Sequence, residues 1–257
     1  MRQPFYQNNL IRLYQGDSLQ LMQKMADNSI DVIVADPPYF LSNGGFSNRG
    51  GKKVSVDKGA WDQVNDKYET SEIFNDLFLK ESRRILKPHG TIWVFGSLHN
   101  IYEVGYLMKQ HDYRILNNIT WQKLNPPPNL SCRMFTHSTE TIIWARKFAK
   151  QKHYYNYDLM REYNHGKQMK DVWSTPVIKQ SERKFGRHPT QKPLAIITRI
   201  IEASTTEEML VLDPFIGSGT TAVACQLLNR HCIGIDLSPE YLEIAKRRIH
   251  NEEETLF

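Results

Sequence analysis

The class of fold follows from residues 209–236, which read MLVLDPFIGSGTTAVACQLLNRHCIGID. An apolar run at 209–212 leads into a loop that carries Gly217 and Gly219. A helical stretch at 220–228 then precedes a second apolar run at 231–235. A strand, a glycine loop, a helix and another strand, in this order, predict a mostly parallel α/β sheet. The glycines also let the start of the helix, with its unpaired N–H groups, come close to a ligand.

The rest of the chain extends this alternation. We expect strands at 11–14, 30–35, 91–95 and 115–121, with a hairpin partner at 141–145, and helices from residue 18 and at 71–86, 101–110, 193–203 and 239–249. A helix-stop signal stands at 87–90. Between 122 and 187 the pattern becomes irregular, with three consecutive prolines and an aromatic cluster. We therefore predict one α/β domain, 1–257, in three parts: 1–121, an irregular insertion at 122–187, and 188–257.

Composition limits the kind of protein. With 257 residues, of which 40% are hydrophobic, the chain can bury a single core, and its net charge of +5 permits an anionic partner. Three cysteines without CxxC spacing and nine scattered histidines give no zinc pattern and fit a reducing cytosol. The chain shows no signal-peptide pattern and no apolar run of membrane-spanning length. We therefore expect a cytoplasmic protein with no metal and no membrane partner.

A second motif, Asp36-Pro37-Pro38-Tyr39, follows the strand expected at 30–35. The nitrogen lone pair of a base amino group is delocalised into the ring, so the amino group is a poor nucleophile. Two hydrogen bonds accepted from it, by the Asp36 carboxylate and a backbone carbonyl, favour a tetrahedral nitrogen. Pro37 fixes the direction of its own carbonyl, Pro38 keeps Pro37 extended, and Tyr39 offers a ring for stacking on an extruded base. The alternative is a plain strand-ending turn.

The glycine loop predicts a ligand that carries a nucleoside. Asp236 follows Gly217 by 19 residues, at the tip of the next expected strand, and suits the ribose hydroxyls. Asp213 ends the preceding strand, where its carboxylate could contact a sulfonium or amino group of the ligand. Phe215 adds an apolar ring to the loop. The glycines also satisfy the dinucleotide fingerprint, which leaves NAD as an alternative. Because the motif at 36–39 has no role in hydride transfer, S-adenosylmethionine is favoured.

Two further residues are candidates for the polar ends of this methyl donor. Asp17 follows the first strand and suits the adenine or amino-acid end, or it caps the helix that begins at Ser18. Lys192, in His-Pro-Thr-Gln-Lys-Pro at 188–193, suits the donor carboxylate, or it is a solvated lysine at a helix start. We expect Pro193 at the first helical position.

Basic segments are candidates for DNA contact. The loop at 41–60 is rich in glycine, lysine and arginine and is expected to close over a flipped base. Lysines, arginines and aromatic residues alternate at 122–187, as phosphate and base contacts require, or as a solvated surface. We expect Trp121 and Trp173 to be core residues. Cys132 lacks the preceding proline of carbon-5 cytosine chemistry and is expected to be an ordinary buried thiol.

On these residues the chain resembles the β-class (permuted) amino-methyltransferases of bacterial restriction–modification systems. The resemblance implies a Rossmann-like S-adenosylmethionine-dependent methyltransferase fold: a mostly parallel seven-stranded sheet with a reversed C-terminal hairpin and a target-recognition insertion at 122–187. It implies a catalytic half at 1–121 and a donor-binding half at 188–257. The catalytic set is then Asp36, Pro37, Pro38 and Tyr39. The donor positions are Lys192, Asp213, Phe215, Gly217, Ser218, Gly219, Thr220 and Asp236, with Asp17 as a further candidate.

The stretches 38–45, 118–123 and 135–141 are similar to the second adenine methyltransferases of DpnII-type systems. This implies methylation of adenine N6 in GATC, in double-stranded and also in single-stranded DNA, and a cognate restriction endonuclease as the system partner. Many β-class members are homodimers. The alternatives are an N4-cytosine methyltransferase and a DNA-binding relative without catalysis. Aspartate rather than serine at position 36 favours adenine.

Overall fold

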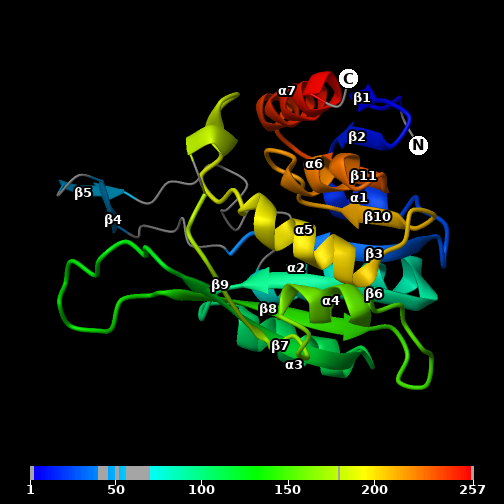
Figure 1. Cartoon of the computed structure of the whole chain (residues 1–257), viewed down its shortest axis with the longest axis horizontal. Coiled ribbons are helices and arrows are strands. Elements are labelled where there is room, and N and C mark those ends of the chain that lie inside the picture. The colour runs from blue at the N-terminus through cyan, green and yellow to red at the C-terminus, as the bar shows by residue number, and fades with distance from the viewer. Residues whose placement is uncertain (1–2, 40–45, 50–51, 56–69, 179, 256–257) are drawn as a thin grey trace.

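A single large sheet organises the computed structural model, which describes residues 3–39, 46–49, 52–55, 70–178 and 180–255. Among these residues nine strands form this sheet, in the order β1-β2-β11-β10-β3-β6-β8-β7-β9 (Figure 1). The strands are β1 (Tyr6–Gln7), β2 (Ile11–Gln15), β3 (Ile30–Ala35), β6 (Leu86–Gly96), β7 (Arg114–Lys123), β8 (Thr139–Arg146), β9 (Val172–Thr175), β10 (Leu210–Asp213) and β11 (His231–Asp236). All run parallel to β3 except β1 and β8.

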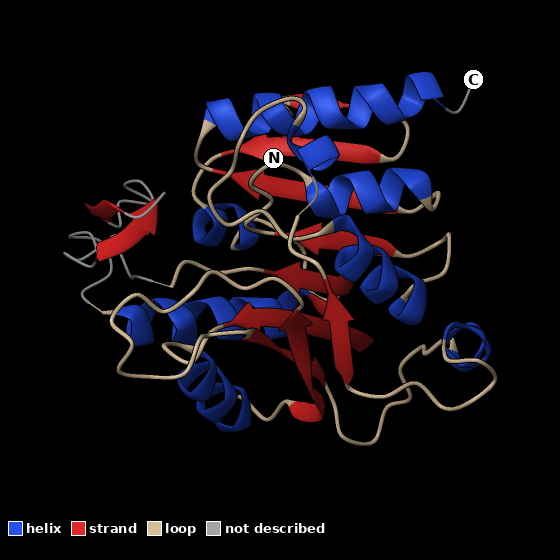
Figure 2. Cartoon of the chain, turned by 60° about the vertical axis from the view of Figure 1, so that its left-hand side comes forward, coloured by secondary structure: helices blue, strands red, loops and turns tan. Residues whose placement is uncertain are grey.

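Helices cover both faces of the sheet (Figure 2). They are α1 (Ser18–Met22), α2 (Ser71–Ile85), α3 (Ile101–Gln110), α4 (Tyr157–Tyr163), α5 (Leu194–Ser204), α6 (Thr220–Leu227) and α7 (Pro239–Thr255). Side chains of β3 alternate between the two faces. Val32 and Val34 join the core under α5, α6 and α7, whereas Ile33 and Ala35 join the core under α1, α2 and α3. The central strands are therefore buried on both sides, as their apolar runs predicted.

The predicted α/β class is confirmed, and β2-β11-β10-β3-β6-β8-β7 form the expected seven strands, with β1 and β9 added at the edges. The position of the reversed hairpin needs correction. It consists of β7 and β8, within residues 114–146, and is not C-terminal. The last strands of the chain, β10 and β11, are instead parallel and lie between β2 and β3. The glycine-loop unit follows the hairpin in the chain but occupies the middle of the sheet.

The helix expected at 71–86 ends at Ile85, as the stop signal at 87–90 predicted, and residues 87–90 then belong to β6. Two local expectations differ from the structure. Pro193 is the N-cap of α5 and not its first residue, because its ψ of 137° is extended. Cys132 is exposed and not buried, since it lies in the β7–β8 connection outside both cores.

The stretch 122–187 also supplies β8 and β9 to the main sheet, so it is not irregular throughout. Trp121 and Trp173 are core residues, as predicted, with exposures of 3% and 5%. Most of the loop at 41–60 lies outside the described residues. The described part forms an antiparallel pair, β4 (Phe46–Arg49) and β5 (Lys52–Ser55). No helix within the described ranges is long and apolar enough to span a bilayer.

Candidate active site

The parallel strands bring three aspartates to one edge of the sheet. Asp36 follows β3, Asp213 ends β10 and Asp236 ends β11. The register pairs Leu212 with Ile33 and Asp213 with Gly234, so the carboxyl ends of these neighbouring strands lie together. Ligands of open α/β sheets bind at this edge.

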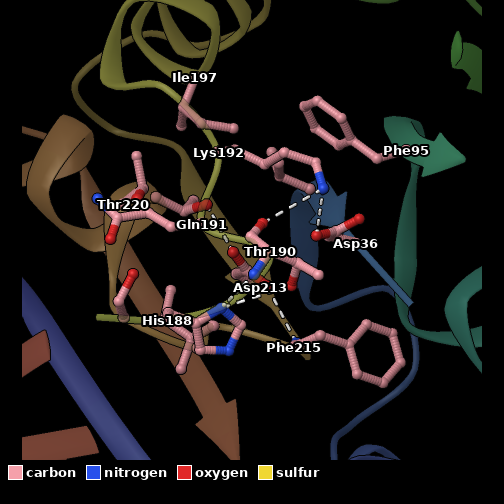
Figure 3. A pocket seen from close by; sticks show the side chains of 15 residues that line it. Asp36, Phe95, His188, Thr190, Gln191, Lys192, Ile197, Asp213, Phe215 and Thr220 are labelled. Carbon is pink, nitrogen blue, oxygen red and sulfur yellow. Dashed lines mark hydrogen bonds and ion pairs between the residues drawn. The ribbon is translucent and has the colours of Figure 1, made fainter. Parts of the chain in front are cut away.

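A small cavity opens at this edge. Its walls come from the end of β3, from β6, from the segment before α5 and from the glycine loop (Figure 3). Predicted site residues on the wall are Asp36, Lys192, Asp213, Phe215, Gly217, Ser218 and Thr220. The structure therefore brings the two motifs, more than 170 residues apart in sequence, to one cavity.

Asp36 is held by two donors inside this cavity. Its Oδ2 accepts from Lys192 Nζ at 2.5 Å, and its Oδ1 accepts from Tyr39 Oη at 2.7 Å. The side chain is 20% exposed. Burial raises the pKa of Asp36, and the Lys192 ammonium offsets only part of this effect. Each carboxylate oxygen keeps a second lone pair for another donor.

Lys192 is buried, with 8% exposure, so it is not a solvated lysine. Its ammonium pairs with Asp36, lies 3.6 Å from Glu140 Oε2, and stands over the rings of Phe95 and Tyr39 at 5.3 and 5.6 Å. Burial lowers the pKa of Lys192, but the Asp36 and Glu140 carboxylates outweigh it and raise the pKa overall. The contact with the donor carboxylate remains a prediction.

The glycine loop needs its glycines for backbone reasons. Gly217 and Gly219 have φ angles of +49° and +83°, in the left-handed region that favours glycine. A Cβ at Gly219 would lie 2.6 Å from the Cβ of Ala245 on α7. The loop therefore turns sharply into α6 while α7 packs directly against it.

The Asp213 carboxylate accepts hydrogen bonds that hold the glycine loop in place. Its Oδ1 accepts from the Phe215 N–H at 3.0 Å and its Oδ2 from Thr221 Oγ1 at 2.5 Å. The side chain is buried, which raises the pKa of Asp213 to about 7. Phe215 packs on Phe78 of α2, with ring centroids 5.3 Å apart. The two residues fix the shape of the cavity wall, and their contact with a donor remains a prediction.

Asp236 ends β11, and Asp17 follows the neighbouring strand β2. Asp236 accepts from the N–H groups of Gly217 and Ser238, at 2.9 and 2.8 Å, and keeps lone pairs for further donors. The N–H of Gly16 donates to the Asp236 carbonyl at 3.0 Å, which places Asp17 nearby. Asp17 caps α1 by accepting from the Gln20 N–H at 2.9 Å. The capping interpretation of Asp17 is confirmed.

Arg248 of α7 was missed by sequence reasoning. This residue is 7% exposed, and its Nη1 donates to the Ser218 carbonyl at 2.7 Å, to Ser218 Oγ at 3.1 Å and to Thr220 Oγ1 at 3.0 Å. Both hydroxyls assigned to the donor site are therefore also anchored from behind. The sequence did contain a signal for this role, because Arg248 lies on the apolar face of the helix expected at 239–249.

His188 also lines the cavity, and Glu140 and Lys123 adjoin it through the contact of Glu140 with Lys192; none of the three was predicted as a residue of this site. Glu140 and Lys123 form an ion pair at 2.6 Å. The ring of His188 lies against Tyr241, with centroids 4.3 Å apart, and burial lowers the pKa of His188 to about 3. Within the described ranges, no group of histidine, cysteine, aspartate and glutamate side chains could hold a metal ion.

The chain is similar to known DNA methyltransferases. A family model described as DNA methylase, for N6 and N4 positions, matches residues 30–247. The chain is 57% identical over 251 residues to the type II methyltransferase M2.LlaDCHI of Lactococcus lactis subsp. cremoris, covering 97% of this chain and 93% of that protein. It is 56% identical over 256 residues to the type II methyltransferase M2.DpnII of Streptococcus pneumoniae, covering 99% and 95%. The crystal structure of an M1.HpyAVI–SAM complex superposes with a TM-score of 0.70 at 26% identity, covering 93% of this chain and 99% of that one.

Proposed function

Because the chain belongs to the N6/N4 DNA methylase family, we propose that it transfers a methyl group from S-adenosylmethionine to N6 of an adenine flipped out of a short DNA sequence. The observation that carries this proposal is the shared cavity. The Asp36 carboxylate and the loop at 213–220 line the same space, as transfer between a base and a bound donor requires.

The donor side of the cavity fits S-adenosylmethionine. When bound, this molecule supplies a methyl group on a positively charged sulfur. Asp236 keeps acceptor capacity for ribose hydroxyls, and the turn at Gly217 and Gly219 exposes the start of α6. Phe215 supplies an apolar wall, and Lys192 and Asp17 are the candidates for the polar ends of the donor. The side chains of Ser218 and Thr220 already bond to Arg248, so we assign them to holding the loop around the donor.

On the acceptor side, Asp36 and the carbonyl of Pro37 accept hydrogen bonds from the amino group of the base. When both N–H groups donate to these acceptors, the nitrogen lone pair points toward the methyl carbon. The reaction needs no covalent intermediate with the protein. Pro38 restricts Pro37 to an extended conformation. Tyr39 holds Asp36 through its hydroxyl and offers its ring to the flipped base.

The wider assignment rests on the resemblance to DpnII-type systems and, for the oligomeric state, on what is common among β-class members. We propose GATC as the target, in double-stranded and also single-stranded DNA, with a restriction endonuclease as the system partner and a homodimer as the working state. We assign 122–187 to target recognition, 1–121 to the catalytic half and 188–257 to the donor-binding half.

The test is methylation of a DNA of known sequence with labelled S-adenosylmethionine, followed by digestion to nucleosides and mass analysis. The expected product is N6-methyladenine, with the label mapped to GATC by sequencing. N4-methylcytosine as the product would instead make cytosine the acceptor. DNA binding without incorporated label would identify a relative that has lost catalysis.

A further inference from the structure

Four charged side chains form a partly buried row beside the cavity. Lys123 Nζ lies 2.6 Å from Glu140 Oε1, Glu140 Oε2 lies 3.6 Å from Lys192 Nζ, and Lys192 Nζ lies 2.5 Å from Asp36 Oδ2. Their side chains are between 8% and 20% exposed. They come from the end of β7, the start of β8, the segment before α5 and the end of β3. The row therefore links the β7–β8 hairpin to the predicted catalytic carboxylate.

Lys192 depends on its counter-ions. A buried ammonium that loses its only carboxylate partner is strongly destabilised, because the low-polarity surroundings do not replace water. Phe95 and Tyr39 present aromatic rings to Lys192. Asp36 is its nearest partner, yet Asp36 is also the group that must bond the amino group of the base. Asp36 has lone pairs for both donors, but a carboxylate that accepts from an ammonium is a weaker acceptor for the amino group of the base. The two demands are therefore in competition.

Glu140 can relieve this competition. Its Oε1 is bound by Lys123, whereas its Oε2 is buried and makes no hydrogen bond within the described part of the chain. At 3.6 Å the contact between Oε2 and Lys192 Nζ is an ion pair too long for a hydrogen bond. A movement of the ammonium by about 1 Å would close this distance to hydrogen-bond length. Burial raises the pKa of Glu140, but Lys192 and Lys123 outweigh it and lower the pKa, so Glu140 is an anion.

We propose that Glu140 is a positioning residue for methyl transfer: it takes up Lys192 when Asp36 turns to the amino group of the base. Lys192 then stays charged and fixed at the cavity while Asp36 is engaged. Lys123 holds Glu140 in place for this exchange. This inference rests on the function proposed above.

The test compares Glu140→Gln with wild-type protein in single-turnover methylation at saturating S-adenosylmethionine and DNA. Glutamine keeps the shape but loses the charge, so Lys192 stays on Asp36. We expect the transfer rate to fall about tenfold or more, while the dissociation constants of donor and DNA change less than about threefold. Glu81→Gln is the matched control, because Glu81 is 15% exposed and pairs with Arg84, and neither residue lines the cavity. Its rate should equal that of wild type.

A pH profile separates positioning from a structural role. Asp36 is faced by Lys192, Tyr39 and Glu140, and the negative charge of Glu140 raises the pKa of Asp36. The acid limb of the transfer rate should therefore move to lower pH in Glu140→Gln, and a loss of stability alone would not move it. A rate within twofold of wild type, or an unmoved acid limb, would overturn the proposal.

Glu140→Asp serves if Glu140→Gln unfolds at a much lower temperature than Glu81→Gln. This variant keeps the carboxylate but withdraws it by one methylene, so its rate should lie between those of wild type and Glu140→Gln. A wild-type rate for Glu140→Asp together with an inactive, misfolded Glu140→Gln would count against positioning. Failure of the wild-type protein itself to methylate DNA would instead refute the proposed function.

Discussion

At the scale of single residues, the surroundings of Asp36 have two opposite effects on the pKa of its carboxyl group. Burial disfavours its charged form, whereas Lys192 and Tyr39 donate hydrogen bonds that favour it, and the net result is a raised pKa. The residue must be ionised to accept the hydrogen bond that we propose from the amino group of the base. Its protonation state therefore sets a condition on activity.

We predict an acid limb in the transfer rate at a higher pH than an exposed aspartate would give. The rate should fall as the pH falls through the raised pKa, because protonated Asp36 donates where it must accept. In Lys192→Met this limb should move to still higher pH, since the ammonium lowers the pKa of Asp36. Rates measured across pH at saturating donor and DNA test this, and a limb that Lys192→Met leaves in place would contradict it.

Arg248 allows a second prediction at this scale. Arg248→Met removes three hydrogen bonds to Ser218 and Thr220 and should lower the free energy of unfolding by about 2–4 kcal/mol. Donor affinity should also fall, because the loop loses its anchor. Urea unfolding and calorimetric titration measure the two effects.

The control is the neighbouring Arg247→Met. Arg247 is 60% exposed and pairs with Glu243 at 3.2 Å, so its loss should cost less than about 1 kcal/mol. Equal effects of the two substitutions would show that the buried contacts of Arg248 do not hold the loop.

At the scale of elements, the junction between the glycine loop, α6 and α7 shapes the cavity. Gly219→Ala introduces both a strained φ and a clash with Ala245. Gly166 has a similar φ of +78°, and a Cβ added there would meet nothing within 4 Å. Gly166→Ala therefore isolates the strain, which costs about 1–2 kcal/mol.

We predict that Gly219→Ala destabilises the protein by at least about 2 kcal/mol more than Gly166→Ala, because α6 and α7 must separate. Donor binding should weaken only in Gly219→Ala. Thermal unfolding and donor titration of both variants provide the comparison. Similar stabilities would mean that α7 does not restrict the loop.

We propose that the β7–β8 connection contacts DNA. Because β7 runs parallel to β3, its carboxyl end lies at the edge that carries Asp36. The connection exposes Phe135 at 95%. Phe135→Ala should weaken DNA binding several-fold and spare donor binding, since an exposed ring there can stack on a base at about 1–3 kcal/mol.

Tyr102→Ala, at an exposed ring on α3, is the control for this prediction, since Tyr102 is 79% exposed. Titration of labelled DNA with both variants compares the two positions. Equal DNA affinity of Phe135→Ala and wild type would remove Phe135 from the interface.

At the scale of the whole molecule, local patterns predicted more than long-range partners. The strands at 30–35 and 231–235 follow from apolar runs, and the two motifs from residue chemistry. The pairing of Lys192 with Asp36 spans 156 residues, and that of Arg248 with Ser218 spans 30. Such pairs can be inferred only when the order of distant strands in the sheet is known, and the sequence pattern does not give that order. The pairing of 115–121 with 141–145, close in sequence, was predicted correctly. The C-terminal position of the reversed hairpin, which the family resemblance implied, was wrong.

The central claim is that Asp36 acts on the amino group while the neighbouring loop holds the methyl donor. Single-turnover methylation by Asp36→Asn, alongside donor titration of the same variant, tests it most directly. We predict a fall in the transfer rate of at least about 10²–10³-fold, with donor affinity within about threefold of wild type. A transfer rate close to that of wild type would contradict the account.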